Sequence, residues 1–410
     1  MRTLKTALAL AACAGLWARA ESNFPLLGTD TTRSTIPLEQ VLSAGPPPQG
    51  VPALGFGGDR TGRFAATPAP AFVPLERSSW LDAQEPLIVH GGKGYPLRLL
   101  LWHEVVNDRA GVPVAVAFSP PSHSFAVFDR RVPLTPEQRD AVLRLDPAAR
   151  VLPLDDDFRA RYREQTGREA PPWGLEVTFG TSGMLYNANL LMFDSASGSV
   201  FSQFLHAGVV GTLASAELLR LPAQVVSAAE FARAYPQGQV LSLETGYPRP
   251  YAQNPYLGYE RLETPGFVGR VLEDRRLPAR ERVLGLEVGG EAVAYAFSSL
   301  ARRRAVNDRV GGVDVAVWWA PGTRSVLDAA TIAQAKDAGA VGVFRRTLEG
   351  RTLSFEWDGQ GWTDRESGSR WNLLGQAVEG PLKGKRLTPL PHDVPFWFAW
   401  TAFRPEAQLR

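Results

Sequence analysis

The sequence predicts a mixed, β-rich α+β fold with two homologous lobes and an extended N-terminal arm. Glycine and proline are frequent, at 39 and 33 of 410 residues, which favours many turns and short strands over a helical bundle. A set of short motifs recurs in the same order in residues 86–241 and 283–410. Residues 21–85 include the proline-rich segment 45–52, which excludes a helix there, so this region is expected to be extended.

The recurring motifs indicate an internal duplication. The pairs, first copy then second, are Tyr95 and Tyr295, Asn107-Asp108 and Asn307-Asp308, Asp194 and Asp364, Ser197-Gly198-Ser199 and Ser367-Gly368-Ser369, Leu221-Pro222 and Leu390-Pro391, and Pro236 and Pro405. The second copy lacks most of residues 131–172, which have helical composition. We expect two similar lobes related by a pseudo-twofold axis, and the surface between them is a natural place for a cleft.

Within the first copy, apolar runs and turn residues define the expected elements. Strands are expected at 87–89, 112–118, 125–128 and 175–179. Helices are expected at 136–145, 155–164 and 228–235. Thr135 is placed to cap the first of these helices, Pro136 occupies its first position, and Pro236 ends the last one.

The N-terminus is typical of an export signal covering residues 1–20. Arg2 and Lys5 precede an apolar run at 7–17, and residues 18–20 (Ala-Arg-Ala) form a cleavage site of the A-x-A type. A second interpretation stays open, because residues 10–13 (Leu-Ala-Ala-Cys) resemble a lipobox in which Cys13 carries the lipid. We therefore expect an exported protein of the periplasm, cell envelope or extracellular space, attached to a membrane only if Cys13 is lipidated.

Composition excludes several classes of function. Cys13 is the only cysteine, so cleavage after Ala20 leaves no thiol for disulfides, thiolate metal sites or nucleophilic catalysis. The net charge is +2, and the signal contributes three positive charges and no acid, so the mature chain is near neutral. We therefore expect no nucleic-acid partner. The sequence has no phosphate-binding loop or dinucleotide fingerprint, so no motif implies a cofactor.

A longer set of motifs matches a known family. These motifs are Gly45-Pro46-Pro47, Gly50-Val51-Pro52-Ala53, Tyr95-Pro96-Leu97, Trp102-His103-Glu104, Phe128-Asp129-Arg130, Ser182-Gly183-Met184-Leu185-Tyr186, Asn254-Pro255-Tyr256, Glu366-Ser367-Gly368-Ser369 and Phe396-Trp397-Phe398-Ala399-Trp400. Through them the chain resembles the bacterial domain of unknown function 3179 family over residues 40–410. The resemblance implies an exported envelope protein and carries no settled activity.

The chain departs from that family at one place. In the family that it resembles, many members carry Cys-Pro-Leu-Cys before the Phe-Asp-Arg strand, whereas this chain has Ser119-Pro120-Pro121-Ser122. Any redox or thiolate-metal role of those cysteines cannot operate here. Either the function of the family does not need them, or this chain has lost that function.

Comparison of the two copies selects the candidate site. His103 and Glu104 align with two arginines in the second copy, so they are unique to the first. A histidine beside a carboxylate can act as a general base or a metal ligand, and if the segment is helical, Asn107 shares a face with His103. Asn107-Asp108 recurs in the second copy, which favours a structural role as turn or cap residues. A buried structural histidine stays open as the alternative for His103.

Further candidates surround this segment. The candidate binding residues are Trp102, Asn107, His123 and Tyr186, and the candidate catalytic residues are His103 and Glu104. A weaker candidate metal site combines His103, His123 and His206, although no ligand spacing supports it. Four tyrosines at 247–259 lie in a Tyr/Pro-rich linker, residues 242–282. They form either a binding wall or a cover over the seam between the lobes.

Three polar motifs have a structural explanation. Residues 181–183 (Thr-Ser-Gly) lack the Gly-x-Ser-x-Gly elbow of a serine hydrolase, so a turn between two strands is expected. Residues 194–199 and 364–369 share Asp-x-x-Ser-Gly-Ser, which is typical of a hairpin turn. The three aspartates at 155–157 are expected at a solvated helix start rather than in a metal site.

These observations predict a non-catalytic role in the cell envelope. A small molecule, a metal or a partner protein would bind near residues 102–107. The alternative is an enzyme or metal-binding protein with a site around His103 and Glu104.

Overall fold

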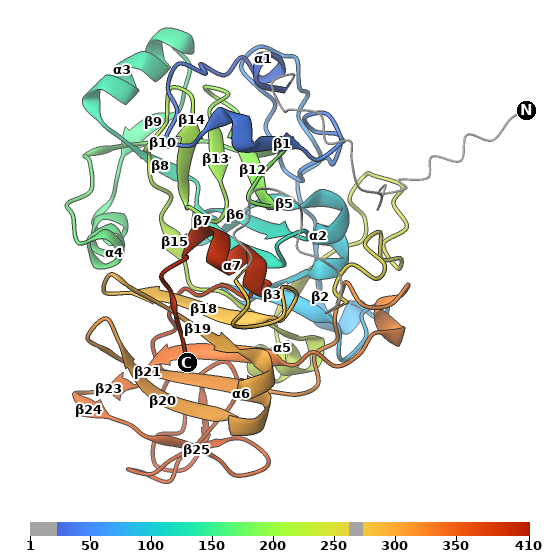
Figure 1. The fold of residues 1–410 in the computed structure, drawn as a ribbon, viewed down its shortest axis with the longest axis vertical. Helices are drawn as coiled ribbons and strands as arrows, with labels where there is room; N and C mark the ends of the chain where they lie inside the picture. Colours follow the sequence, from blue (N-terminus) through green and yellow to red (C-terminus); the bar gives the residue numbers. More distant parts are fainter. Residues whose placement is uncertain (1–22, 262–273) are drawn as a thin grey trace, which may run out of the picture.

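The computed structural model describes residues 23–261 and 274–410, and strands dominate it (Figure 1). The expected signal segment and Cys13 lie outside the described residues. The helices are α1 (Asn23–Leu27), α2 (Leu97–His103), α3 (Pro136–Leu145), α4 (Asp156–Thr166), α5 (Ala228–Ala234), α6 (Phe297–Arg303) and α7 (Trp397–Phe403). Short 3-10 helices lie at Leu38–Gln40, Leu75–Arg77 and Ile332–Gln334. The fold is therefore mixed and β-rich, as the sequence predicts.

We call residues 86–241 the first half and residues 283–410 the second half. One sheet consists of β1 (Val41–Ser43) from the N-terminal arm and four strands of the first half. Its order is β1, β11 (Phe179–Tyr186), β12 (Asn189–Asp194), β13 (Val200–Ser202) and β14 (Ala207–Val210). Another is β15 (Arg220–Leu221), β7 (Ser124–Asp129), β6 (Val112–Ser119) and β5 (Val105–Ala110). A third is β16 (Gln224–Ser227), β3 (Pro86–His90), β4 (Lys93–Pro96) and β17 (Gln239–Leu241), with β2 (Phe72–Pro74) of the N-terminal arm at its edge. A small sheet beside α3 and α4 is β8 (Arg131–Leu134), β10 (Trp173–Glu176) and β9 (Val151–Pro153).

The second half has sheets of similar strand order. One sheet consists of β25 (Phe355–Trp357), β26 (Trp362–Asp364), β27 (Arg370–Trp371) and β28 (Ala377–Glu379). A second consists of β20 (Ala305–Val310), β21 (Val313–Ala320) and β22 (Ala340–Arg345). A third consists of β18 (Val283–Val288), β19 (Glu291–Ala296) and β29 (Gln408–Leu409). A further pair is β23 (Thr347–Leu348) and β24 (Arg351–Thr352).

One parallel strand pair has the same register in both halves. In the first half β17 runs parallel to β4, with Gln239 opposite Lys93 and Val240 opposite Gly94. In the second half β29 runs parallel to β19, with Gln408 opposite Val293 and Leu409 opposite Ala294. In each half this pair brings the end of the half back beside its second strand, so the chain closes each half in the same way.

The two halves share one apolar core instead of facing each other across an open cleft. One cluster of buried side chains joins Ile88 and Val116 of the first half to Leu284 and Val317 of the second. Another packs residues of β3, β16 and β17 against β21 and β22, with Trp318 fully buried between them. Burying a large apolar side chain stabilises a fold by about 1.5–3 kcal/mol, so separating the halves would be costly. The expected cleft is reduced to a small pocket.

The N-terminal arm is largely extended, but it packs closely on the first half. Phe24 and Leu27 of α1, together with Ile36 and Phe56, are buried in the core of the first half. Strand β1 pairs antiparallel with β11 and so forms one edge of its sheet. The arm therefore belongs to the folded body.

Several expected local structures are confirmed. Helix α3 begins at Pro136, and Thr135 caps it in a capping box with Gln138. Helix α5 ends just before Tyr235 and Pro236. The Asp194 carboxylate accepts backbone N–H groups across the turn between β12 and β13, at 2.9 Å from Ala196. Capping and turn chemistry are local, and the sequence alone specifies them.

Two expected local structures are wrong. The strand expected at 175–179 is split between β10 and β11. Residues 181–183 do not form a turn, because they lie inside β11, where the pairing with β12 shifts between Thr181 and Met184. Gly183 has a φ of 68°, and a Cβ there would lie 2.1 Å from the Pro46 carbonyl oxygen. The close approach of the arm explains this irregularity in β11, and no local sequence pattern predicts that approach.

Candidate functional site

His103 is the last residue of helix α2 and is fully buried. Its Nδ1 lies 2.7 Å from the Pro52 carbonyl oxygen, and its Nε2 lies 2.6 Å from the Tyr251 hydroxyl. A carbonyl oxygen only accepts, so Nδ1 carries the proton and Nε2 accepts the Tyr251 hydroxyl proton. The Thr245 hydroxyl in turn forms a hydrogen bond with the Tyr251 hydroxyl oxygen, at 2.5 Å between the two oxygens. Burial lowers the pKa of His103 to about 4, so the ring is neutral at pH 7.

Both ring nitrogens of His103 are therefore occupied. The residue ties the arm, at Pro52, and the linker, at Tyr251, to the end of α2. No lone pair remains for a metal or for a substrate proton. This geometry favours the structural interpretation of His103 and leaves Glu104 as the candidate for chemistry.

Asn107 lies in strand β5, because helix α2 already ends at His103. The expected shared helical face of the two residues is therefore wrong. The Asn107 side chain bonds the backbone of Phe179 in both directions, donating at 2.9 Å and accepting at 2.7 Å. Asn307 bonds Phe355 in the same two ways, both at 2.9 Å. These asparagines join neighbouring strands, so the expected turn or cap role is also wrong.

Glu104 occupies the junction where α2 turns into β5. Its φ of 57° and ψ of −37° form a backbone conformation that residues with a Cβ rarely adopt. Its N–H bonds the Leu100 carbonyl at 2.9 Å, and its own carbonyl accepts the Phe118 N–H at 2.8 Å. The Glu104 carboxyl makes no hydrogen bond or ion pair with any residue that the structure describes. Burial raises the pKa of this carboxyl to about 7.

The groups near Glu104 are aromatic and weakly polar. Burial raises the pKa of Tyr256 well above its usual value, and the Glu104 carboxylate raises it further, so the two groups lie within electrostatic reach. The indole Nε1 of Trp102 is buried and has no hydrogen-bond partner within residues 23–261 and 274–410. The segment thus contributes a half-buried carboxyl without a partner in the described chain and an unsatisfied N–H donor, with a phenol nearby.

The histidines do not gather into a metal site. His123 donates from Nδ1 to the Val394 carbonyl at 2.8 Å, and burial together with Arg282 lowers its pKa to about 3. His206 contacts the Phe128 ring, and burial together with Arg220 lowers its pKa well below the usual value. No group of three or more His, Cys, Asp or Glu side chains in the described part of the chain is arranged to hold a metal ion.

An ionic cluster that no sequence motif predicts lies where the linker meets the second half. The Glu260 carboxylate accepts from Arg282 at 2.5 Å and from Ser325 at 2.6 Å, and Lys336 lies 2.9 Å away. Burial alone would raise the pKa of Glu260, but Arg282, Ser325 and Lys336 outweigh it and lower the pKa to about 2. Its members come from three distant segments, so only the tertiary fold brings them together.

At the position of the family's cysteines, the chain places two fully buried serines in a polar network. Ser119 accepts a backbone N–H of β12 at 3.1 Å, and Ser122 lies 2.9 Å from the Ser124 hydroxyl. Asn189 donates to Ser122 at 3.0 Å and to Gln203 at 2.6 Å. The serines are satisfied by this network, which joins the β6–β7 turn to β12.

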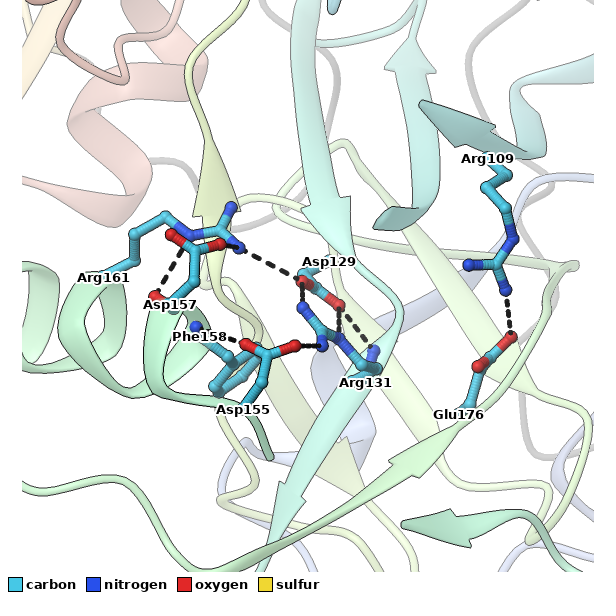
Figure 2. A network of polar contacts seen from close by, with 8 residues as sticks. All are labelled: Arg109, Asp129, Arg131, Asp155, Asp157, Phe158, Arg161 and Glu176. Atoms are coloured by element: carbon cyan, nitrogen blue, oxygen red, sulfur yellow. Dashed lines mark hydrogen bonds and ion pairs between the residues drawn. The ribbon is translucent and has the colours of Figure 1, made fainter. Parts of the chain in front are cut away.

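A second network fixes the start of helix α4 to strands β7 and β8 (Figure 2). Arg131 binds the buried carboxylate of Asp129 through two nitrogens, at 2.9 Å and 2.6 Å, and reaches Asp155 at 2.5 Å. Asp155 also caps the helix by accepting the N–H of the third helical residue at 2.8 Å. Asp157 pairs with Arg161 at the surface. These aspartates begin a helix, as the sequence predicts.

The tyrosines of the linker pack over the seam. The rings of Tyr247 and Tyr251 lie 5.6 Å from the His103 ring, centroid to centroid. Tyr247, Tyr256 and Tyr259 all pack against the core that the halves share. This packing favours a cover over the seam; linker residues 262–273 lie outside the described residues. Tyr186 instead contacts the Phe403 ring of α7.

The fold and these sites define a β-rich protein whose halves share one core. No helix in the described residues is both long and apolar enough to cross a membrane. The chain matches the family described as "Protein of unknown function (DUF3179)" over residues 61–407, and it belongs to that family. No curated protein matches the chain, and no solved structure matches it.

Proposed function

We propose that the chain is an exported protein of the cell envelope with a non-catalytic binding role, centred on Glu104. The export signal at residues 1–20 supports the location. The observation that carries the binding role is the Glu104 carboxyl, which has no partner in the described chain although burial raises its pKa to about 7. Burial disfavours the ionised form of this carboxyl, and a ligand that supplies a cationic donor offsets that penalty.

The chemistry near Glu104 favours a small organic cation as the ligand. The ionised carboxyl attracts an ammonium group, and the ring of Tyr256 lies within electrostatic reach of that carboxyl. Cations bind favourably to aromatic faces, and a carboxylate adds a charge-assisted hydrogen bond. A partner protein that inserts a lysine side chain has the same chemistry, so an envelope protein remains within the proposal.

The test is a thermal-shift and calorimetric panel of small ammonium compounds, from methylammonium to choline and cadaverine, on the purified protein. We expect at least one of them to bind the wild type at pH 8 and to bind Glu104→Gln at least about tenfold more weakly, a loss of about 1.4 kcal/mol. Glu164→Gln, at the exposed end of α4, is the matched control and should bind like the wild type. Equal binding by Glu104→Gln and the wild type would remove Glu104 from the site.

The alternative is an enzyme in which Glu104 is a general acid or base. A pKa of about 7 is the observation that favours it, because acid–base catalysis is most effective when the pKa lies near the working pH. Each compound that binds is incubated with the protein and analysed by mass spectrometry. Conversion that disappears in Glu104→Gln supports the enzyme, and recovery of unchanged compound supports the binding role.

We also propose that the two halves are copies of one module. The repeated motifs in the sequence support this, as do the matching registers of β17–β4 and β29–β19. The Tyr95 hydroxyl bonds Asp108 at 2.8 Å, and the Tyr295 hydroxyl bonds Asp308 at 2.7 Å. A solved structure in which the halves superpose poorly, with these pairs out of register, would contradict the duplication.

A further inference from the structure

Three consecutive arginines lie at the end of helix α6, and we call Arg302–Arg304 the arginine cluster. Arg302 and Arg303 are exposed, and Arg304 is half-buried. None of their side chains makes an ion pair or hydrogen bond with any residue that the structure describes. Helix α6 itself has no acidic residue, and the Glu281 carboxylate that bonds this helix does so at its opposite end, through the Ser298 N–H. No described carboxylate therefore pairs with the cluster.

Two indole rings flank the guanidinium of Arg304. Its central carbon lies 4.4 Å from the centre of the Trp319 ring and 6.0 Å from the centre of the Trp357 ring. Trp357 ends strand β25 and is half-buried, so part of its ring is open to solvent. Stacking on an indole uses the face of the guanidinium and leaves its in-plane N–H groups for an acceptor. One of the nitrogens, Nη1, is buried and has no acceptor within residues 23–261 and 274–410.

The acidic residues on either side of Trp357 already have cationic partners of their own. Glu356 pairs with Arg365, and Asp358 lies 3.2 Å from Arg370. These carboxylates are compensated without the arginine cluster. The positive charge at the end of α6 is therefore open to an anion from outside the chain.

This surface lacks the apolar side chains that insert into a bilayer. The large hydrophobic residues that are exposed in the described part of the chain lie elsewhere than α6 and β25; they are Leu26, Leu145, Trp173, Leu257 and Val378. Interfacial segments hold a membrane through buried apolar side chains as well as charge. The cluster thus favours an anionic polymer in water over a lipid surface.

We propose that the arginine cluster and Trp357 bind an acidic polysaccharide whose sugars carry carboxylate groups. The guanidinium groups donate to the carboxylates, since the planar fork of arginine matches a carboxylate, and the exposed part of the Trp357 ring packs against the C–H face of a sugar ring. One exposed charge contact is weak, so repeated carboxylates along a polymer supply the affinity. The site goes beyond the proposed function, because it lies at the junction of the second half and takes a ligand of opposite charge.

The test is biolayer interferometry of the purified protein at low ionic strength on immobilised polygalacturonate, with polyglutamate as a polyanion without sugars and dextran as a neutral polysaccharide. We expect the wild type to bind polygalacturonate most tightly, polyglutamate more weakly and dextran not at all, and added salt to weaken binding. The double variant Arg302→Gln/Arg303→Gln should bind polygalacturonate about tenfold more weakly, because the lost contacts recur along the polymer.

A matched control removes the same charge from the first half. Arg163 and Arg168 are also exposed, but they pair with Glu169 and Glu217. The double variant Arg163→Gln/Arg168→Gln should therefore bind polygalacturonate like the wild type. Unchanged binding in the variant of the arginine cluster, or an equal loss in this control, would overturn the proposal. Circular dichroism melting checks that both variants are folded.

The sugar part of the proposal has its own variant. Trp357→Leu keeps an apolar side chain but removes the flat ring, so its binding of polygalacturonate should fall to the level of polyglutamate while polyglutamate binding stays unchanged. Equal affinity of the wild type for the two polymers would contradict a sugar ligand. Binding to phosphatidylglycerol vesicles without binding to polygalacturonate would assign the cluster to lipid and overturn the proposal. Glu104→Gln should bind polygalacturonate normally, so failure of the ammonium site and failure of this site are distinguishable.

Discussion

Glu104 and Arg304 occupy the same backbone position in the two halves but carry opposite charges. Each ends a seven-residue helix with a positive φ, 57° and ψ −37° at Glu104, and 62° and ψ −36° at Arg304. Each bonds its N–H to the carbonyl four residues earlier, at 2.9 Å and 2.8 Å. Each carbonyl accepts an N–H from the second strand after the helix, at 2.8 Å and 3.0 Å.

The difference lies in what the side chains contact. The Arg304 guanidinium lies 4.4 Å from the centre of the Trp319 ring, in a cation–π contact. The Glu104 carboxyl has no bonded partner in the described residues. The unusual backbone is therefore part of the helix-to-strand junction of both halves, and strain alone does not mark a functional site. A carboxyl with a raised pKa, in place of a guanidinium over the Trp319 ring, is what distinguishes the first half.

The largest expected effect compares the asparagines that follow these junctions. Asn107→Ala removes two bonds to Phe179 and one to the Leu54 carbonyl in a fully packed site, so we expect a loss of about 3 kcal/mol in the free energy of unfolding. Asn307→Ala removes two bonds in a more exposed site, so we expect about 2 kcal/mol. Urea unfolding measures both. A larger loss for Asn307→Ala would show that the second half depends more on this link.

The second-largest expected effect is a pH dependence of stability that only Glu104, of the two junction residues, should produce. The folded pKa of Glu104, about 7, exceeds its usual value of 4.5, so the folded state binds the proton more tightly than the unfolded chain. The stability of the wild type should therefore fall as the pH rises from about 4.5 to about 7. Glu104→Gln removes this loss, so it should be about 2 kcal/mol more stable than the wild type at pH 8 and equal to it at pH 4.

Arg304→Gln is the matched control for that experiment. Arginine stays charged throughout this pH range, so the variant should differ from the wild type by the same amount at pH 4 and pH 8. Chemical denaturation at both pH values measures the differences. If Glu104→Gln shows no pH-dependent gain, the carboxyl has a partner in solution, and the proposed binding site loses its main support.

A smaller effect tests whether the halves are equivalent. Tyr95→Phe and Tyr295→Phe each remove one hydroxyl bonded to the aspartate of the following strand, so each should cost about 1–2 kcal/mol. Lys93 and Arg410 also pair with these aspartates, so neither carboxylate is left without a cation. Thermal unfolding measures both variants. A difference above about 1 kcal/mol between them would weaken the structural match.

The smallest expected effect concerns the strained backbone itself. Glycine adopts positive φ freely but loses more entropy on folding, so Glu104→Gly should gain about 0.5–1 kcal/mol at pH 4, where the carboxyl is protonated. Arg304→Gly also relieves strain but loses the Trp319 contact, so its stability should stay within about 0.5 kcal/mol of the wild type. Equal gains for both variants would show that the Trp319 contact contributes nothing.

Local chemistry was predictable from the sequence, and junctions were not. The Thr135 cap, the turn built on Asp194 and the helix start at Asp155 depend on residues within five positions of one another. The junction at Glu104 depends on Phe118, which lies fourteen residues later. The Phe118 N–H in strand β6 donates a hydrogen bond to the Glu104 carbonyl oxygen. The sequence therefore did not reveal that the helix ends at His103 and that Asn107 lies in a strand, because nothing local stops the helix there.

Comparison of the copies within the sequence singled out His103 and Glu104, and the structure separates their roles. His103 is satisfied by Pro52 and Tyr251, which are 51 and 148 residues away in the chain. Such partners are invisible to any pattern in the sequence. The same holds for the Glu260 cluster, whose charges are spread over three segments that share no motif.

By itself, the sequence determined the β-rich class, the family and the elements whose signals are local. The tertiary structure decided how the halves meet, since they bury apolar faces against each other and leave a narrow pocket instead of a cleft. It also decided which polar groups are satisfied. The physical reason is range: capping and turn bonds join neighbours in the chain, whereas burial and charge pairing depend on residues that only the complete fold brings into contact.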